Sequence, residues 1–164
     1  MDPVTVSILI DAPRERVFDY LLDLANHSEF TDHYLRDWHL TRENSVGLGA
    51  GARFRVAAPG NRFSWADVTF AEVEHPHRIV EVGRGGKGNR VRTLGVYELS
   101  PDSGGTTRVR FTLQTQPRTL SDRLMESLGA RGWLKRQNNK AMRRLRSIIE
   151  SDEGRGARVT IAGG

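Results

Sequence analysis

The sequence predicts an α+β domain in which a curved antiparallel sheet of about six or seven strands surrounds a long C-terminal helix. Three changes in hydrophobic spacing support this prediction. Alternation gives way to a helical period near residue 12, returns between residues 34 and 116, and becomes helical again after residue 117. Strands that follow one another along the chain favour antiparallel pairing, with helices on one face. Because a sheet this long has to curl, the last helix is expected to cover its concave side.

The first predicted elements are one strand and two short helices. Residues 4–10 are rich in β-branched side chains, which are typical of a strand. Asp11 is the expected N-cap of a helix over residues 13–24, because Pro13 suits an early helical position and apolar residues then recur at helical spacing. A second short helix is expected over residues 26–32.

The middle of the chain is expected to form about six consecutive strands. The clearest segments are residues 53–56, 62–74, 79–82, 90–99 and 106–115. The last two are joined by a run of turn-forming residues, so they are expected to pair as a hairpin. In the final strand apolar residues alternate with arginine, threonine and glutamine, which predicts one buried face and one hydrated face.

The C-terminal part of the domain is predicted to be a helix over residues 119–150. Its apolar residues recur every three or four positions. Gly129 and Gly132 fall inside this helix and should bend or loosen it, because each costs about 1 kcal/mol relative to alanine. Residues 151–164 are rich in glycine and polar residues and are expected to be a flexible tail, so the folded domain spans residues 1–150.

Composition excludes several classes of protein and site. The 164 residues are enough for one domain with a sizeable core. The absence of cysteine excludes disulfides, thiol catalysis and cysteine-bound metals. No apolar run approaches the roughly 18 residues of a membrane span. The N-terminus has no basic segment and no cleavage site, so a cytoplasmic location is expected.

Positive charge is concentrated near the C-terminus. Residues 1–117 carry a balance of −1, from 14 basic and 15 acidic residues, whereas residues 118–164 carry +6, from 11 and 5. The basic residues that could form surfaces are Arg131, Lys135, Arg136, Lys140, Arg143 and Arg144 on the helix, and Arg90, Arg92, Arg108 and Arg110 on strands. No stacking aromatic residues are interleaved with them, which argues against nucleic-acid binding and favours a hydrated surface.

Three short motifs lie in a fixed order along the chain. They are I-x-I-D-A-P-x-E-x-V-F-x-x-L-x-D over residues 8–23, E-x-P-x-R-I over residues 74–79, and Y-x-L-x-P over residues 97–101 followed by G-T-x-x-V over residues 105–109. In this order the chain resembles, over residues 4–150, the START-related helix-grip superfamily (SRPBCC), in its polyketide cyclase/dehydrase and lipid-transport branch. An aromatic residue, often tryptophan, follows the first helices of that family, and Phe30 takes its place here.

The resemblance implies a cavity between the sheet and the last helix that holds an apolar or aromatic small molecule. Carriers, cyclases, dioxygenase subunits and chaperone regulators share this fold, so the fold does not decide the function. Alternation along the strands and the helix predicts the lining. The residues expected to bind the ligand are Phe54, Val56, Phe63, Trp65, Thr93, Gly95, Tyr97, Val109, Phe111, Leu113, Leu124, Leu128, Trp133 and Met142. The alternative is that these side chains fill a solid core.

Three residues are candidates for catalysis. If Asp67 shares the inward phase of Trp65, its pKa should be raised and it could act as the general base of an aldol-type ring closure. The opposite phase of Val68 leaves open that Asp67 faces water. Glu81, between two valines, is a second candidate base, and Tyr97 could polarise a substrate.

Metal and phosphate sites are not expected. The histidines (His27, His33, His39, His75 and His77) show no helical i, i+4 pair and are expected on the surface or in loops. The glycine-rich residues 83–90 lack both the following helix and the Ser/Thr of a phosphate loop, so they are expected to form a hairpin loop that could cover the cavity mouth. No cofactor is predicted.

The sequence therefore supports three functional hypotheses. The leading one is binding of a hydrophobic or aromatic small molecule, lipid-like or polyketide-like, by a monomer or homodimer. The second is a polyketide cyclase or aromatase. The third is a regulatory domain that binds a protein or RNA partner through its arginine-rich surfaces.

Overall fold

Seven strands and three α-helices make up the computed structural model, which describes residues 1–62, 64–118, 129–151, 156, 158 and 159. The strands are β1 (Val4–Ile10), β2 (Leu35–Leu40), β3 (Gly51–Val56), β4 (Trp65–Glu74), β5 (Arg78–Gly85), β6 (Val91–Pro101) and β7 (Thr107–Gln116). The helices are α1 (Arg14–Leu22), α2 (His27–Thr31) and α4 (Ala130–Ser151), with short 3₁₀ turns η1 (Leu24–Asn26), η2 (Lys87–Asn89) and η3 (Ser103–Gly105).

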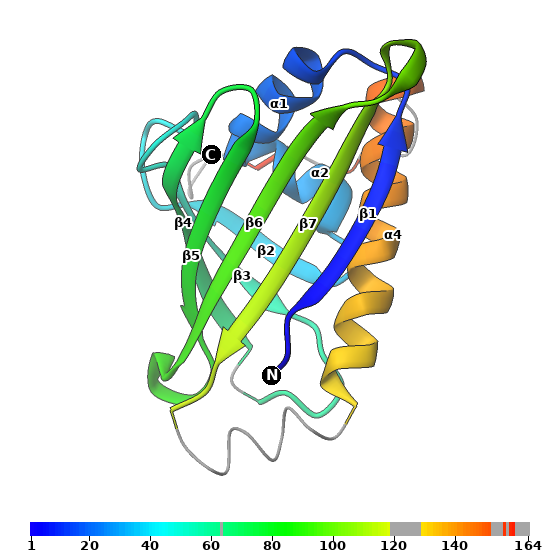
Figure 1. Ribbon diagram of the computed structural model, residues 1–164. Helices are drawn as coiled ribbons and strands as arrows, with labels where there is room; N and C mark the ends of the chain where they lie inside the picture. The colour runs from blue at the N-terminus through cyan, green and yellow to red at the C-terminus, as the bar shows by residue number, and fades with distance from the viewer. Residues whose placement is uncertain (63, 119–128, 152–155, 157, 160–164) are drawn as a thin grey trace.

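The strands form one antiparallel sheet in the order β1-β7-β6-β5-β4-β3-β2. Strands β2 to β7 are neighbours in sequence and in space, whereas β1 pairs with β7 at the opposite edge from β2. The helices α1 and α2 therefore carry the chain from one edge of the sheet to the other. Figure 1 shows the sheet curling, with α4 beside β1 and the two short helices at one end. The predicted α+β fold, a helix-grip sheet around a long C-terminal helix, is confirmed.

The main core lies at the end of the sheet that the short helices cover. There the inward residues of β1, β6 and β7 pack against α1 and the last turns of α4. The side chains that pack here and are almost fully buried include Ile10, Val17, Phe18, Leu21, Leu99, Val109, Leu145 and Ile148. Apolar residues at helical spacing on α1 and α4 thus meet apolar residues at alternate strand positions, which is the pattern that buries both faces.

Element boundaries differ from the predictions in three places. The expected Asp11 cap is wrong, because α1 begins at Arg14 with Pro13 at its N-cap, and the backbone amide of Asp11 instead donates to Glu150 Oε1 (2.8 Å). Strand β4 begins at Trp65 rather than at residue 62. Strand β5 is longer than predicted and includes the first glycines of the glycine-rich stretch.

The start of α4 is explained by a glycine. Gly129 has φ +91°, a left-handed conformation that other residues rarely adopt, and the helix follows from Ala130. The predicted helical residues 119–128 lie outside the described residues. Parts of the expected flexible tail contact the domain, since Gly156 N donates to Glu29 O (2.9 Å) and Val159 N to Ala25 O (3.1 Å). Within the described parts of the chain, no helix combines the length and apolar content that crossing a bilayer requires.

Candidate functional site

A pocket of about 230 Å³ lies between the concave face of the sheet and α4, at the end away from the short helices. Its mouth is formed by the β3–β4 loop, the β5–β6 turn and the first turns of α4, which contribute Asn61, Gly86 and Leu134. The walls are mainly apolar side chains from β3, β4 and β7. A smaller recess of about 40 Å³ lies deeper, toward the main core. The two hollows share Tyr34, Leu35, Phe54, Val68, Glu81 and Phe111, so the recess continues the pocket.

Aromatic rings form much of the recess. Tyr97 and Phe111 are cross-strand partners on β6 and β7, and their rings stack with centroids 4.4 Å apart. Trp38 and Phe54 lie 4.5 Å apart on the opposite wall. Such pairs add about 0.5–1.5 kcal/mol beyond the area that they bury. The recess therefore has rigid walls that the sheet register positions.

Among the described residues, Glu81 is the only acidic one in the lining of the recess. It shares the inward phase of Ile79 on β5 and lies opposite Gly95 on β6. A Cβ atom at residue 95 would come within 2.4 Å of Glu81 Oε1, so the glycine provides the space for the carboxyl group. Burial raises the pKa of Glu81 to about 7. No described residue forms an ion pair or hydrogen bond with this carboxyl group. Glu81 is half-buried, because its side chain faces the pocket.

Asn138 brings an unsatisfied amide into the same recess. Its side chain on α4 is 1% exposed, and its Oδ1 accepts a hydrogen bond from Tyr34 Oη (3.0 Å). Its Nδ2 has no hydrogen-bond partner in the described structure. A buried donor without a partner costs about 1–3 kcal/mol, so native proteins rarely retain one without a reason. A hydrogen-bond acceptor in the recess would satisfy it.

Tyr97 adds a third polar group. Burial raises the pKa of its phenol well above the ordinary value, and the nearby Glu81 charge adds to the shift. Its hydroxyl forms no hydrogen bond with any described residue. Burial raises the pKa of Tyr34 in the same way. Both tyrosines are therefore neutral hydrogen-bond donors across the whole physiological range.

His27 lies at the inner end of the recess. The expected surface position of this histidine is wrong, since it is buried among the rings of Phe30, Phe70 and Tyr97, with centroids 5.3 to 5.7 Å away. Its Nε2 lies 2.8 Å from the carbonyl oxygen of Leu21, which can only accept, so Nε2 carries the proton. Burial lowers the pKa of His27 to about 4, which keeps the ring neutral.

Most of the predicted ligand-binding residues that the structure describes lie around the pocket. Those that line the pocket or its recess are Phe54, Val56, Thr93, Tyr97, Phe111, Leu113 and Met142. Gly95 lies beneath Glu81, and Trp133 lies outside the mouth, 6.0 Å from Tyr34 between ring centroids. Val109 is fully buried in the main core instead. Phe63, Leu124 and Leu128 lie outside the described residues.

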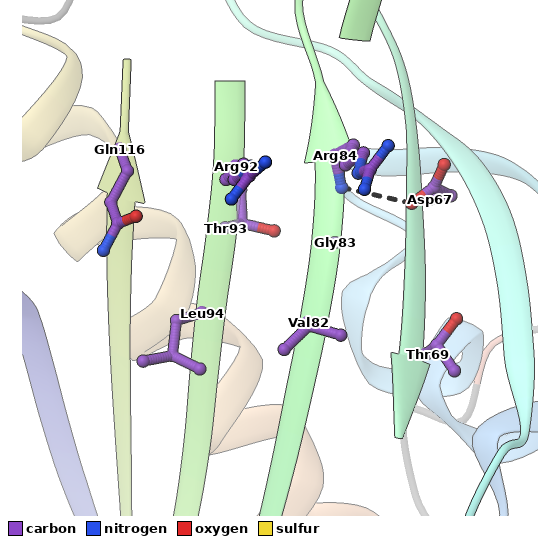
Figure 2. Close-up of a pocket in the computed structure, with 9 residues that line it drawn as sticks. All are labelled: Asp67, Thr69, Val82, Gly83, Arg84, Arg92, Thr93, Leu94 and Gln116. Carbon is purple, nitrogen blue, oxygen red and sulfur yellow. Dashed lines mark hydrogen bonds between the residues drawn. The ribbon is translucent and has the colours of Figure 1, made fainter. Parts of the chain in front are cut away.

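The predicted inward orientation of Trp65 is wrong, and of the two orientations that the sequence left open for Asp67, the outward one is observed. Strand β4 forms a wall of the pocket at both residues, but their side chains project to the outer face. The Trp65 ring lies under the guanidinium groups of Arg53 and Arg55, at 5.1 and 5.9 Å, and is 40% exposed. Asp67 accepts a hydrogen bond from Arg84 N (3.1 Å), as Figure 2 shows.

The strand register explains why Trp65 and Asp67 lie on the outer face. Val68 pairs with Ala52 and Gly83, which places it on the inner face, so the residues on either side of it face outward. The bulge in β4 lies farther along, between Phe70 and Glu72. Of the three catalytic candidates, Glu81 and Tyr97 therefore meet in the recess and Asp67 does not.

Asn138 and Tyr34 are the site residues that sequence reasoning missed. A signal for Asn138 was present, because it is a lone polar residue in the apolar stripe that runs from Leu134 to Met142 and Leu145 on α4. Tyr34 carries no such signal, since it lies in the short segment between α2 and β2. Among the described residues, no cluster of three or more His, Asp or Glu side chains could hold a metal ion.

Known structures share this fold across nearly the whole chain. TTHA0849 from Thermus thermophilus is 17% identical, with a TM-score of 0.71 over 92% of this chain and 99% of its own. DR_A0006 from Deinococcus radiodurans is 18% identical (TM-score 0.59, 90% and 97% covered). A truncated norcoclaurine synthase from Thalictrum flavum is 11% identical (TM-score 0.69, 92% and 94% covered). At these identities the likeness shows the fold alone.

Sequence comparison gives the family. No curated protein sequence matches this chain significantly. The family model described as polyketide cyclase / dehydrase and lipid transport matches residues 1–150. This match covers the curled sheet, both short helices and almost all of α4. The chain therefore belongs to the polyketide cyclase/dehydrase and lipid-transport family.

Proposed function

We propose that this protein binds a compact hydrophobic small molecule in the pocket between the sheet and α4. The observation that carries the proposal is an apolar pocket whose inner end holds polar atoms without hydrogen-bond partners among the described residues, the Glu81 carboxyl group, the Tyr97 hydroxyl and Asn138 Nδ2. Apolar walls with a few convergent polar groups are typical of ligand sites. The volume of about 230 Å³ is slightly below the roughly 300–1,000 Å³ of pockets for drug-sized ligands, which favours a compact ligand.

The arrangement also suggests how the ligand is oriented. Its apolar body would lie against Phe54, Val56 and Leu113 in the outer part of the pocket. A polar head that carries an oxygen atom would lie in the recess. A carbonyl oxygen has two lone pairs, so it could accept hydrogen bonds from Asn138 Nδ2 and from the Tyr97 hydroxyl at once. Lipid-like and polyketide-like ligands both carry such a head.

A pair of matched variants tests the binding site. Leu113→Trp would fill the pocket, whereas Leu94→Trp places the same ring on the opposite face of the sheet. Native mass spectrometry of freshly purified protein, followed by thermal shift with fatty acids, sterols and aromatic polyketides, measures occupancy. We expect wild type and Leu94→Trp to bind the same ligand and Leu113→Trp to lose it. Equal binding by both variants, or no binding by wild type across the panel, would contradict the proposal.

Catalysis of the cyclase or aromatase type is the second candidate function, and Glu81 favours it. A carboxylate with a pKa of about 7 can accept a proton from a carbon next to a carbonyl group near neutral pH. Tyr97 and Asn138 would donate hydrogen bonds to the enolate oxygen that forms. The enolate carbon could then attack a second carbonyl carbon of the same molecule and close a ring, and protonated Glu81 would return its proton to the alkoxide oxygen that forms.

Glu81→Gln separates catalysis from binding. The amide keeps the shape of the side chain but accepts no proton, so we expect binding to persist and exchange of the α-proton of a bound ketone to stop. Asp67→Asn is the matched control, because it neutralises a carboxylate on the outer face of the neighbouring strand. Unchanged exchange in Glu81→Gln would rule out this role and leave the binding function intact.

A further inference from the structure

Arginines on the outer face of the sheet differ in whether a carboxylate neutralises them. Several are paired. These are Arg55 with Asp37 (3.1 Å), Arg78 with Glu72 (2.8 Å), Arg108 with Asp102 (3.1 Å) and Arg110 with Glu98 (3.9 Å). For Arg84 on β5 and Arg92 on β6, no described residue forms an ion pair or hydrogen bond with either guanidinium group. Arg36 and Arg53 also lack a carboxylate partner in the described part of the chain, but neither lies opposite a second unpaired arginine.

These two arginines are directly opposite each other in the register of β5 and β6. Like charges in this position destabilise an antiparallel pair. The nearest acidic residue across β5 is Asp67, but its carboxylate accepts a hydrogen bond from the backbone amide of Arg84 and pairs with neither guanidinium group. The two arginines thus have one neighbouring carboxylate, which forms an ion pair with neither, and local conflicts of this kind are expected at functional sites.

Arg84 and Arg92 also line a groove of about 440 Å³ on the outer face, on the other side of the sheet from α4. Figure 2 shows their side chains next to each other, with Val82 and Leu94 farther along the same two strands. Val82 is 42% exposed, so it offers apolar surface beside the two arginines. Thr69 and Gln116 add polar groups at the sides. The lining carries two positive charges and one negative charge, the latter on Asp67.

We propose that this groove binds a phosphate-bearing small molecule, with the phosphate between the guanidinium groups of Arg84 and Arg92 and the carbon skeleton on Val82 and Leu94. A guanidinium group presents two parallel N–H donors, and a carboxylate, with two oxygens, matches one such fork. A phosphate monoester has three terminal oxygens and can accept from two forks at once. The site lies on the opposite face from the hydrophobic pocket and does not depend on the function proposed for that pocket.

Titration calorimetry at constant ionic strength, with phenyl phosphate and inorganic phosphate as probes, tests the site. The test variant is Arg84→Gln/Arg92→Gln. The matched control is Arg108→Gln/Arg110→Gln, which removes the same charge from the same face of the sheet. We expect phenyl phosphate to bind wild type and the control alike, and more tightly than inorganic phosphate because of the apolar floor. The test variant should lose at least about tenfold in affinity, since two charge-assisted contacts are removed.

A vesicle arm distinguishes the source of the phosphate. Phosphatidylcholine vesicles are compared with and without phosphatidic acid in co-sedimentation. Retention on phosphatidic acid that is lost in Arg84→Gln/Arg92→Gln would identify a lipid headgroup, whereas phenyl phosphate binding without retention would identify a soluble phosphate ester. Both outcomes support the site. No saturable phenyl phosphate binding in the millimolar range, or an equal loss in the control variant, would overturn it.

Discussion

The two ends of the concave face are built from the same strands, yet one is solid and the other hollow. Near the short helices, Leu99 and Val109 pack against α1 and the last turns of α4 and are almost fully buried. Four residues after Val109 on the same strand, Leu113 faces the pocket and remains partly exposed. The difference comes from the helices, because α1 and α2 cover only one end of the sheet. A hydrophobic pattern therefore tells which residues face inward, but it does not tell what they meet there.

The polar residues divide in the same way. On the outer face Arg55, Arg78, Arg108 and Arg110 have carboxylate partners, and these exposed pairs change stability little. At the boundary between the solid and hollow ends, Glu81 and Asn138 have polar atoms without partners in the described structure. Leaving such groups buried lowers stability. The contrast agrees with the ligand binding that we propose for the hollow end.

The sharpest test of the comparison replaces one leucine at each end. Leu99→Ala should lower the free energy of unfolding by about 3–4 kcal/mol, because it opens a cavity in close-packed surroundings. Leu113→Ala should lower it by only about 1 kcal/mol, because the pocket already lacks atoms on one side of this residue. Urea denaturation measures both. Equal losses would mean that the two ends are packed alike.

Glu81→Gln tests how the residue at the boundary between the solid and hollow ends affects the pH dependence of stability. The folded-state pKa of Glu81 is raised to about 7 from 4.5, so the folded protein holds this proton more tightly than the unfolded chain between these pH values. The contribution of Glu81 to wild-type stability should therefore fall as pH rises from 4.5 to 7 and stay reduced above pH 7. The glutamine variant should be more stable than wild type by up to about 3 kcal/mol at pH 8 and equally stable at pH 4. Thermal unfolding across this range measures the difference.

His27 gives the same variant a second readout. Its pKa is lowered to about 4 from 6.5, so the unfolded chain binds this proton more readily and stability should rise with pH between 4 and 6.5. In wild type the opposite slopes of His27 and Glu81 should largely cancel over this window. Glu81→Gln should reveal the rise that His27 causes. If the stability of the variant does not change between pH 4 and 6.5, His27 does not contribute the expected pH dependence.

Tyr34 and Asn138 form a polar pair that a double-mutant cycle can dissect. Tyr34→Phe should cost about 1–2 kcal/mol, because it removes the donor to Asn138 Oδ1 and leaves the whole amide unsatisfied. Adding Asn138→Leu should recover most of this loss, since no buried polar group then remains at either position. Chemical denaturation of the two single variants and the double variant gives the coupling. Additive losses would contradict the pairing.

The smallest effect is expected on the outer face. Arg110→Ala removes an exposed ion pair with Glu98 and should change the free energy of unfolding by less than about 0.5 kcal/mol. The change should shrink further in high salt. A loss comparable with that of Leu99→Ala, measured in the same denaturation series, would show that the outer face contributes to folding as much as the core does.

Alternating and helical patterns were sufficient to predict the order of elements, an antiparallel sheet of about six or seven strands and the hairpin of β6 and β7. They were also sufficient for Tyr97 and Phe111, because a long regular strand keeps its phase. Prediction failed at Trp65 and left the orientation of Asp67 open, because the register with the neighbouring strands decides on which face these side chains lie. It failed at His27 as well, since a histidine in a short helix carries no sign of whether other elements will cover it.

Gly95 on β6 lies directly beneath the carboxyl group of Glu81. Alanine at this position would place a methyl group where the Glu81 carboxyl group now lies, and the acid would have to turn toward a different part of the pocket. One carbon atom on β6 thus controls whether the neighbouring strand can present an ionisable group to a bound molecule. Relatives that carry a larger residue here are expected to bind their ligands without help from an acid on β5.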